Sequence, residues 1–117
     1  MKKKVIVISL GGSLIIPDKV DTRFLKKFKK IILKNTNKHK FIIVCGGGSI
    51  ARKYISSLRQ IGVNEKLQSF SGISATRMNA RFMSYFFNNN QEEGIPHTMK
   101  LLDKYIKKKD VIFCGAL

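Results

Sequence analysis

The stretch KFIIVCGGGSIARKYI, residues 40–55, decides the fold class. It opens with a continuous apolar run over 40–45, a pattern typical of a strand buried on both faces. Three consecutive glycines follow, and a helical pattern then runs from about Ser49 to Gly62, a residue type that commonly ends helices. The apolar stripe of this helix consists of Ile50, Ala51, Tyr54, Ile55, Leu58 and Ile61. A strand, a glycine turn and a helix in direct succession indicate an α/β domain.

The rest of the chain continues this alternation. We expect further buried strands over 4–10 and 110–115, and helices over 21–35, about 73–87 and 98–108. Asp21 or Thr22 is the expected N-cap of the first of these helices, and Thr98 that of the last. Residues expected on the inner faces of the first two are Phe24, Leu25, Phe28, Ile31, Ile32, Thr76, Ala80, Met83 and Phe87. The fold class is therefore α/β, with a parallel-rich sheet flanked by helices in αβα layers.

The domain organisation is simple. The 117 residues show no internal repeat and no linker, so one domain is expected. Three strands make a small sheet for this class, and the sequence ends shortly after the last of them. We therefore expect residues 1–117 to be the first part of a longer domain.

The charge is strongly basic, with 23 Lys and Arg against 7 Asp and Glu and a formal net charge of +16. Such an excess attracts polyanions, so a nucleic-acid-binding α/β module is one open reading. The lysines are spread over helix faces and the N-terminus, and the chain is also rich in Ile, Asn and Phe. That mixture is what an A/T-biased coding sequence produces, and we expect only nonspecific nucleic-acid binding by charge.

The other composition signals are plain. Cys45 and Cys114 each end an apolar run, and two isolated cysteines predict buried thiols rather than a disulfide framework or a metal site. His39 and His97 have no partners at ligand spacing. No segment is long enough to span a membrane, so we expect a cytoplasmic protein without membrane contact.

The strand ends carry the chemistry. SLGGS (9–13) and CGGGS (45–49) both follow apolar strands, and the carboxyl ends of parallel strands lie along one edge of the sheet, where ligands bind. Glycine turns let main-chain N–H groups approach a phosphate, and a following helix N-terminus adds donors and a favourable dipole. Arg52 can add a charge-assisted contact. The pair predicts a phosphate site, although neither turn is a Walker loop or a G-x-G-x-x-G fingerprint.

A further polar stretch, SFSGISATRMNARFM (69–83), carries Gly72, Thr76, Arg77 and Asn79 near the start of a helix. Its spacing alone leaves its role open between capping and ligand binding. Together, VISLGGSLIIP, VCGGGSIARKYI, GISATRMNARFM and VIFCGA resemble, in order and spacing, the N-terminal half of archaeal-type UMP kinases of the amino-acid-kinase family. The resemblance covers essentially the whole chain.

The resemblance implies a function. Members transfer the γ-phosphate of ATP to UMP, giving UDP for pyrimidine nucleotide synthesis, with Mg²⁺ and usually as hexamers. It implies ATP contacts at Gly11, Gly12, Ser13, Gly48 and Arg52, and UMP contacts at Gly47 and Ser69. Ser69 stands where the family has an aspartate, so weaker UMP binding is expected. No catalytic residue is identified beyond phosphate positioning by Gly12 and Arg52.

The same resemblance implies what the chain lacks. The family's UMP loop and its adenine- and metal-binding half follow the last motif, so impaired activity is expected of these 117 residues alone. Another small-molecule kinase of the family, such as a carbamate, isopentenyl phosphate or acetylglutamate kinase, stays an alternative because the first glycine turn is shared. The GI..TR.NA stretch favours UMP.

Overall fold

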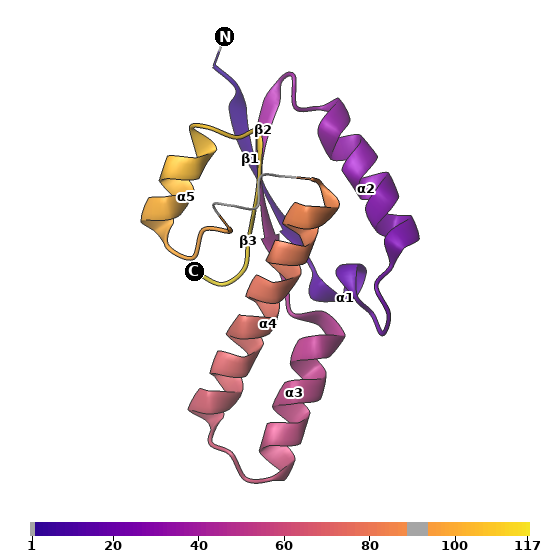
Figure 1. Ribbon diagram of the computed structural model, residues 1–117, viewed down its shortest axis with the longest axis vertical. Helices are drawn as coiled ribbons and strands as arrows, with labels where there is room; N and C mark the ends of the chain where they lie inside the picture. Colours follow the sequence, from indigo (N-terminus) through magenta and orange to yellow (C-terminus); the bar gives the residue numbers. More distant parts are fainter. Residues whose placement is uncertain (1, 89–93) are drawn as a thin grey trace.

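A computed structural model describes residues 2–88 and 94–117. The strands form one three-stranded sheet, and Figure 1 shows helices on both sides of it. In chain order the elements are β1 (Lys4–Leu10), α1 (Gly12–Ile15), α2 (Thr22–Lys34), β2 (His39–Cys45), α3 (Gly48–Gln60), α4 (Glu65–Phe86), α5 (Met99–Ile106) and β3 (Val111–Cys114). The expected α/β class is confirmed.

The sheet is parallel, with the strand order β1-β2-β3. Leu10, the last residue of β1, is paired with Cys45, the last residue of β2. Val44 is paired with Cys114, so β3 ends at nearly the same level. The register therefore places the glycine turns that follow β1 and β2 side by side at the carboxyl edge of the sheet.

One face of the sheet carries the main core. Phe41, Ile43 and Phe113 point to this face and pack with buried side chains of α2 and α4. This core includes Leu25 and Ile32 of α2, Ala80 and Met83 of α4, and Phe87, the C-cap residue of α4. Ile31, expected on the inner stripe of α2, is instead 62% exposed, because it lies at the border of the stripe and turns to solvent.

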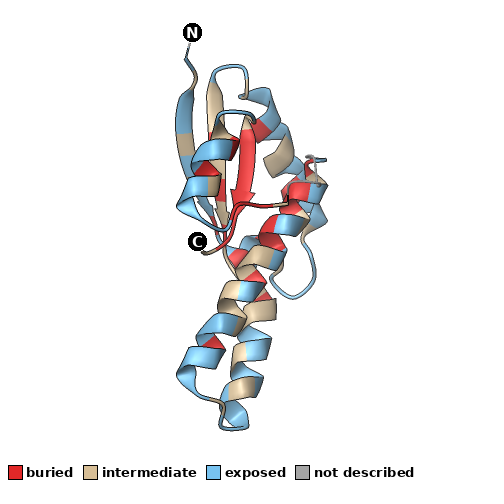
Figure 2. Cartoon of the chain, turned by 60° about the vertical axis from the view of Figure 1, so that its left-hand side comes forward, coloured by how far each residue is buried: buried red, intermediate tan, exposed pale blue. Residues whose placement is uncertain are grey.

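The opposite face is only partly covered. Leu102 and Tyr105 of α5 pack on Ile112 of β3, and this small cluster reaches Ile42 of β2. No helix among the described residues covers the same face of β1, where Val5 is 47% and Val7 65% exposed (Figure 2). The expectation that strand 4–10 is buried on both faces is therefore wrong, because β1 is an edge strand with one bare face.

The helix ends follow from local signals. Asp21 accepts a hydrogen bond from the Phe24 N–H, and Thr98 accepts one from the Leu101 N–H, so both are N-caps as expected. Gly62 follows α3 with a φ of 84°, the left-handed conformation that favours glycine. The short helix α1 was not anticipated.

The helix expected over 73–87 begins eight residues earlier, at Glu65, where Asn64 is its N-cap. Its first turns lie beside α3, and the two helices extend together beyond the carboxyl edge of the sheet (Figure 1). Because many residues of this segment are polar, apolar periodicity does not predict this part of the helix. Among the described residues, no helix combines the length and apolar character needed to cross a membrane.

Candidate functional site

The two glycine turns are in direct main-chain contact at the carboxyl edge of the sheet. A Cβ added to Gly12 would lie 2.6 Å from the Cα of Gly48 and 2.7 Å from the carbonyl carbon of Gly46. The Gly46 N–H donates to the carbonyl of Leu10, which joins the turns at their base. Glycine is thus required here for backbone-to-backbone packing, whatever it also contributes to the approach of a phosphate.

The second turn leads into α3 without a side-chain cap. Gly47 is the N-cap residue of α3, and Gly48 has a φ of 62°, which a residue with a side chain rarely adopts. No acidic side chain lies in the first turn of α3. A helix N-terminus of this kind carries partial positive charge and favours an anion.

Arg52 connects the two turns. Its Nη1 donates to the Ser13 hydroxyl at 3.0 Å and its Nη2 to the Pro17 carbonyl at 3.2 Å. Both Arg52 and Ser13 are exposed, so the guanidinium keeps access to solvent. The structure thereby gathers Gly11, Gly12, Ser13, Gly47, Gly48 and Arg52, which the sequence had selected from two separate segments.

The sequence spacing leaves the role of Asn79 open, and the structure gives this residue a clear place. Its side chain is 3% exposed, and its Nδ2 donates to the carbonyls of Gly46 and Gly47 at 2.9 and 3.1 Å. Because both bonds go to the glycine turn, α4 fixes the shape of that turn from behind. The sequence shows Asn79 only as a polar residue on a helix, and spacing does not reveal that it pairs with a glycine turn 32 residues away.

The same helix also holds the chain after β3. The Thr76 hydroxyl accepts from the Ala116 N–H at 3.0 Å, and Arg77 Nε donates to the Ala116 carbonyl at 3.0 Å. A Cβ on Gly115 would lie 2.6 Å from Thr76 Oγ1, so this glycine too is set by close approach. The polar residues Thr76, Arg77 and Asn79 of α4 thus position the exits of β2 and β3.

Ser69 lies apart from this cluster. It belongs to α4 rather than to a loop, is exposed, and lines a separate pocket with Ile55, Arg59, Glu65 and Gln68. It precedes Asn79 by ten residues, or about 15 Å along a helix. The structure therefore does not bring Ser69 to the glycine turns.

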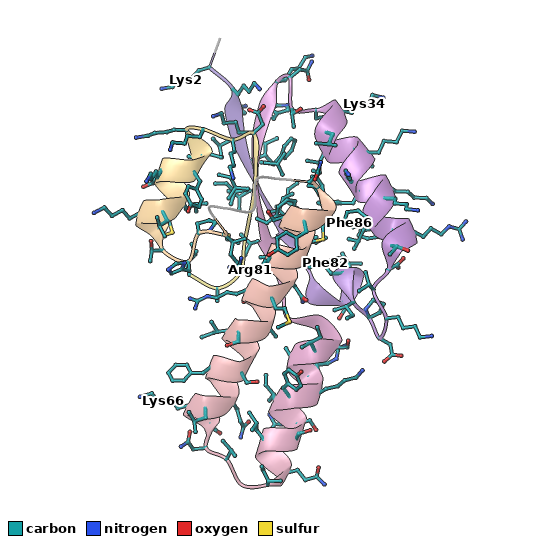
Figure 3. The ribbon with its side chains drawn as sticks, viewed as in Figure 1. Lys2, Lys34, Lys66, Arg81, Phe82 and Phe86 are labelled. Atoms are coloured by element: carbon teal, nitrogen blue, oxygen red, sulfur yellow. The ribbon has the colours of Figure 1, made fainter. Side chains whose placement is uncertain are left out.

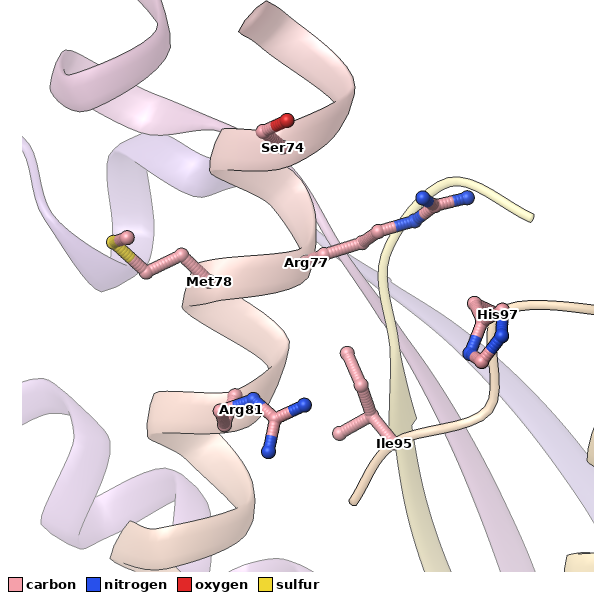
Figure 4. Close-up of a pocket in the computed structure, with 6 residues that line it drawn as sticks. All are labelled: Ser74, Arg77, Met78, Arg81, Ile95 and His97. Atoms are coloured by element: carbon pink, nitrogen blue, oxygen red, sulfur yellow. The ribbon is translucent and has the colours of Figure 1, made fainter. Parts of the chain in front are cut away.

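A basic pocket of about 490 Å³ lies between α4 and the segment that carries Ile95 and His97; its lining is Ser74, Arg77, Met78, Arg81, Ile95 and His97. In Figure 4, Arg77 extends toward the chain that follows β3, and Arg81 toward Ile95. None of the residues predicted to bind ATP or UMP lines it.

The lysines do not form a single patch. Figure 3 shows Lys2, Lys34 and Lys66 at three widely separated parts of the molecule. The cysteines are free and buried, as expected. Burial, reinforced by the nearby Cys114, raises the pKa of the Cys45 thiol to about 12, and burial also raises the pKa of Cys114. Both thiols therefore stay protonated and unreactive near neutral pH.

Comparisons with known proteins agree with this fold. Residues 4–112 match the profile described as the Amino acid kinase family. The chain is 52% identical over 75 residues to a uridylate kinase of Thermoplasma volcanium, a match that spans 64% of this chain and 33% of that protein. It is 33% identical over 112 residues to that of Methanosarcina barkeri, spanning 96% of this chain and 48% of the relative.

Solved structures give the same result. Uridylate kinase from Archaeoglobus fulgidus superposes with a TM-score of 0.81 at 30% identity, over 96% of this chain and 50% of that chain. UMP kinase from Ureaplasma parvum shares the fold, with a TM-score of 0.76 at 20% identity over 98% and 54% of the respective chains. Even in the longest of these matches, the chain spans only about half the length of the relative. The family match, together with the parallel sheet and its paired glycine turns, shows that this chain belongs to the amino acid kinase family.

Proposed function

We propose that the chain is the phosphate-positioning half of a UMP kinase, a domain that transfers the γ-phosphate of ATP to UMP and yields UDP. The observation that carries the proposal is the contact between the two glycine turns at one sheet edge, with Arg52 joined to Ser13 beside them. The relatives named uridylate kinase support UMP as the acceptor. The GI..TR.NA stretch favours UMP over the acceptors of the other kinases in the family.

The chemistry follows from charge. A UMP phosphate oxygen is already ionised at neutral pH and attacks the γ-phosphorus directly, while the bond to the ADP oxygen breaks, so no general base is required. The main work is to hold two polyanions in line and to neutralise the charge that builds up between them. Main-chain N–H groups of the turns, the α3 N-terminus and the Arg52 guanidinium supply fixed positive charge for this purpose.

The resemblance divides these groups between the two substrates. We assign Gly11, Gly12, Ser13, Gly48 and Arg52 to ATP and Gly47 to UMP. Ser69, outside this cluster, stays a prediction from the resemblance. Asn79 acts as a positioning residue because it holds the second glycine turn, and Thr76 and Arg77 hold the chain that follows β3 in the same way.

Mg²⁺ is proposed as the ion that accompanies ATP. Within residues 2–88 and 94–117, no three His, Cys, Asp or Glu side chains gather as a metal site. Asp18, the carboxylate of the loop after α1, is exposed and paired with Lys53 at 3.2 Å. The described residues therefore do not fit a protein-held magnesium site, and no step above depends on one. Mg²⁺ commonly binds through substrate phosphates.

Nucleotide binding by the chain itself tests the proposal. Isothermal titration with ATP at 150 mM KCl should show binding that weakens at least about tenfold in Arg52→Ala, the loss of one charge-assisted contact. Arg59→Ala is the matched control, because Arg59 lies on the same helix but lines the pocket of Ser69. Equal weakening by both substitutions would show that general basic charge, and not the glycine turns, binds the nucleotide.

Turnover tests the reaction. UMP-dependent ADP release should be very slow for the chain alone and should appear when the remaining half of the domain is supplied. Carbamate, acetylglutamate and isopentenyl phosphate serve as competing acceptors in the same assay, and a preference for one of them would replace UMP in the proposal. We further propose a homo-oligomer, as the family resemblance implies, which light scattering can check.

A further inference from the structure

Two arginines and a histidine line a pocket that the proposed function does not use. Arg77 and Arg81 line it from α4, and His97 lines it from the segment before α5 (Figure 4). Its volume of about 490 Å³ lies within the range of small-molecule sites, roughly 300–1,000 Å³. None of its described lining residues is acidic, so this lining offers the two guanidinium groups no counter-charge.

The positive groups of this pocket keep most of their donors available. Arg77 Nε donates to the Ala116 carbonyl at 3.0 Å, and its two Nη atoms make no hydrogen bond within residues 2–88 and 94–117. In the same part of the chain, Arg81 and His97 make neither a hydrogen bond nor an ion pair. Like charges four residues apart on a helix repel each other, so Arg77 and Arg81 form an unfavourable pair that a bound anion relieves.

The other walls of the pocket are main chain and apolar side chains. Gly94 has a φ of 67°, and a Cβ added to it would lie 3.5 Å from Arg81 Nη2, so bare main chain packs beside the guanidinium. Ile95, which follows, is a buried apolar wall. Met78 is 60% exposed and adds apolar surface from α4. The pocket therefore combines cationic groups with apolar walls.

This combination fits one class of ligand. Guanidinium groups bind phosphate oxygens through paired N–H donors, which makes arginine a preferred residue for phosphate recognition. A phosphate dianion matches two arginines with a histidine beside them, and Met78 and Ile95 offer contact to a small apolar group esterified to that phosphate. We propose that this pocket is a second anion site, which binds a small phosphate monoester independently of the glycine turns.

Isothermal titration of the 117-residue chain with phenyl phosphate, in about 150 mM KCl, tests the proposal. We expect saturable binding that weakens at least about tenfold in Arg81→Ala, the loss of one charge-assisted contact. Arg81→Lys should weaken it less, because lysine keeps the charge but not the paired donors. Arg59→Ala controls for general charge and Arg52→Ala for the glycine turns, and both should bind as tightly as the unsubstituted chain. All three arginines are exposed, and a thermal melt of each variant checks that it folds.

A second pair of titrations tests the apolar walls. Phenyl phosphate should bind several-fold more tightly than inorganic phosphate, and Met78→Ser should remove this advantage without changing the affinity for inorganic phosphate. Equal affinity of the unsubstituted chain for the two probes would overturn the assignment of a monoester.

Three results would overturn the site itself. The first is the absence of phenyl phosphate binding, and the second is equal weakening in Arg81→Ala and Arg59→Ala. The third is weakening in Arg52→Ala but not in Arg81→Ala, which would place the phosphate at the glycine turns. The inference goes beyond the proposed function, because neither probe is a substrate of the proposed kinase. Loss of phenyl phosphate binding in Arg81→Ala and loss of ATP binding in Arg52→Ala are separate readouts, so either proposal can fail alone.

Discussion

The contact between the glycine turns predicts different effects on stability for alanine substitutions at two adjacent residues, Gly11 and Gly12. Gly12→Ala would place a methyl group within 2.7 Å of backbone atoms of both Gly46 and Gly48. Backbone cannot rotate away as a side chain can, and overpacking typically costs about 1–3 kcal/mol, so we expect a loss near the upper end, about 3 kcal/mol. Against a total stability of roughly 5–15 kcal/mol, this is a large fraction.

Gly11→Ala is the matched control. Gly11 has a φ of −57° and a ψ of 138°, which alanine adopts freely, and an added Cβ meets no atom within 4 Å. We expect a change between no effect and a gain of about 0.4–1 kcal/mol, because alanine restricts the unfolded chain.

Urea unfolding of both variants, followed by circular dichroism, measures the difference. With an m-value of about 1.5 kcal/mol/M, the Gly12→Ala midpoint should fall by about 2 M, while the Gly11→Ala midpoint should stay or rise. Midpoints for the two variants within about 0.3 M of each other would refute the close approach of the turns, and with it the geometry on which the phosphate site depends.

Three further predictions follow from other contacts. Asn79→Leu leaves the carbonyls of Gly46 and Gly47 without their buried donor, so the free energy of unfolding should fall by about 2–4 kcal/mol in urea titrations, and a loss below about 1 kcal/mol would contradict the positioning role. Thr98→Ala removes the N-cap of α5 and should cost about 1 kcal/mol in the same assay; an unchanged midpoint would count against the cap. For Cys45, burial raises the pKa to about 12, so above pH 9 the folded state holds a proton that the unfolded state loses; stability should therefore fall from pH 9 toward 12, less steeply in Cys45→Ala, and parallel pH profiles would exclude this contribution.

The sequence was a good guide where the signals are local. Apolar runs followed by glycine predicted the three strands and their parallel class, and the capping residues Asp21 and Thr98 predicted where two helices begin. It was a poorer guide to α4, because the first turns of that helix are polar and pack on α3 rather than on the sheet. Apolar periodicity is silent about such a segment.

The same distinction between local and tertiary information applies to the candidate site. The sequence determined which residues can form tight turns after strands, since glycine spacing and helix starts are properties of neighbouring residues. Only the tertiary structure decided that Gly12 touches Gly46 and Gly48, that Asn79 fixes the second turn from behind, and that Ser69 lies elsewhere. It also decided that Val7 is bare although its strand reads as buried. The reason is physical: strand register and helix packing bring together residues far apart in the chain, and such contacts leave no periodic trace in the sequence.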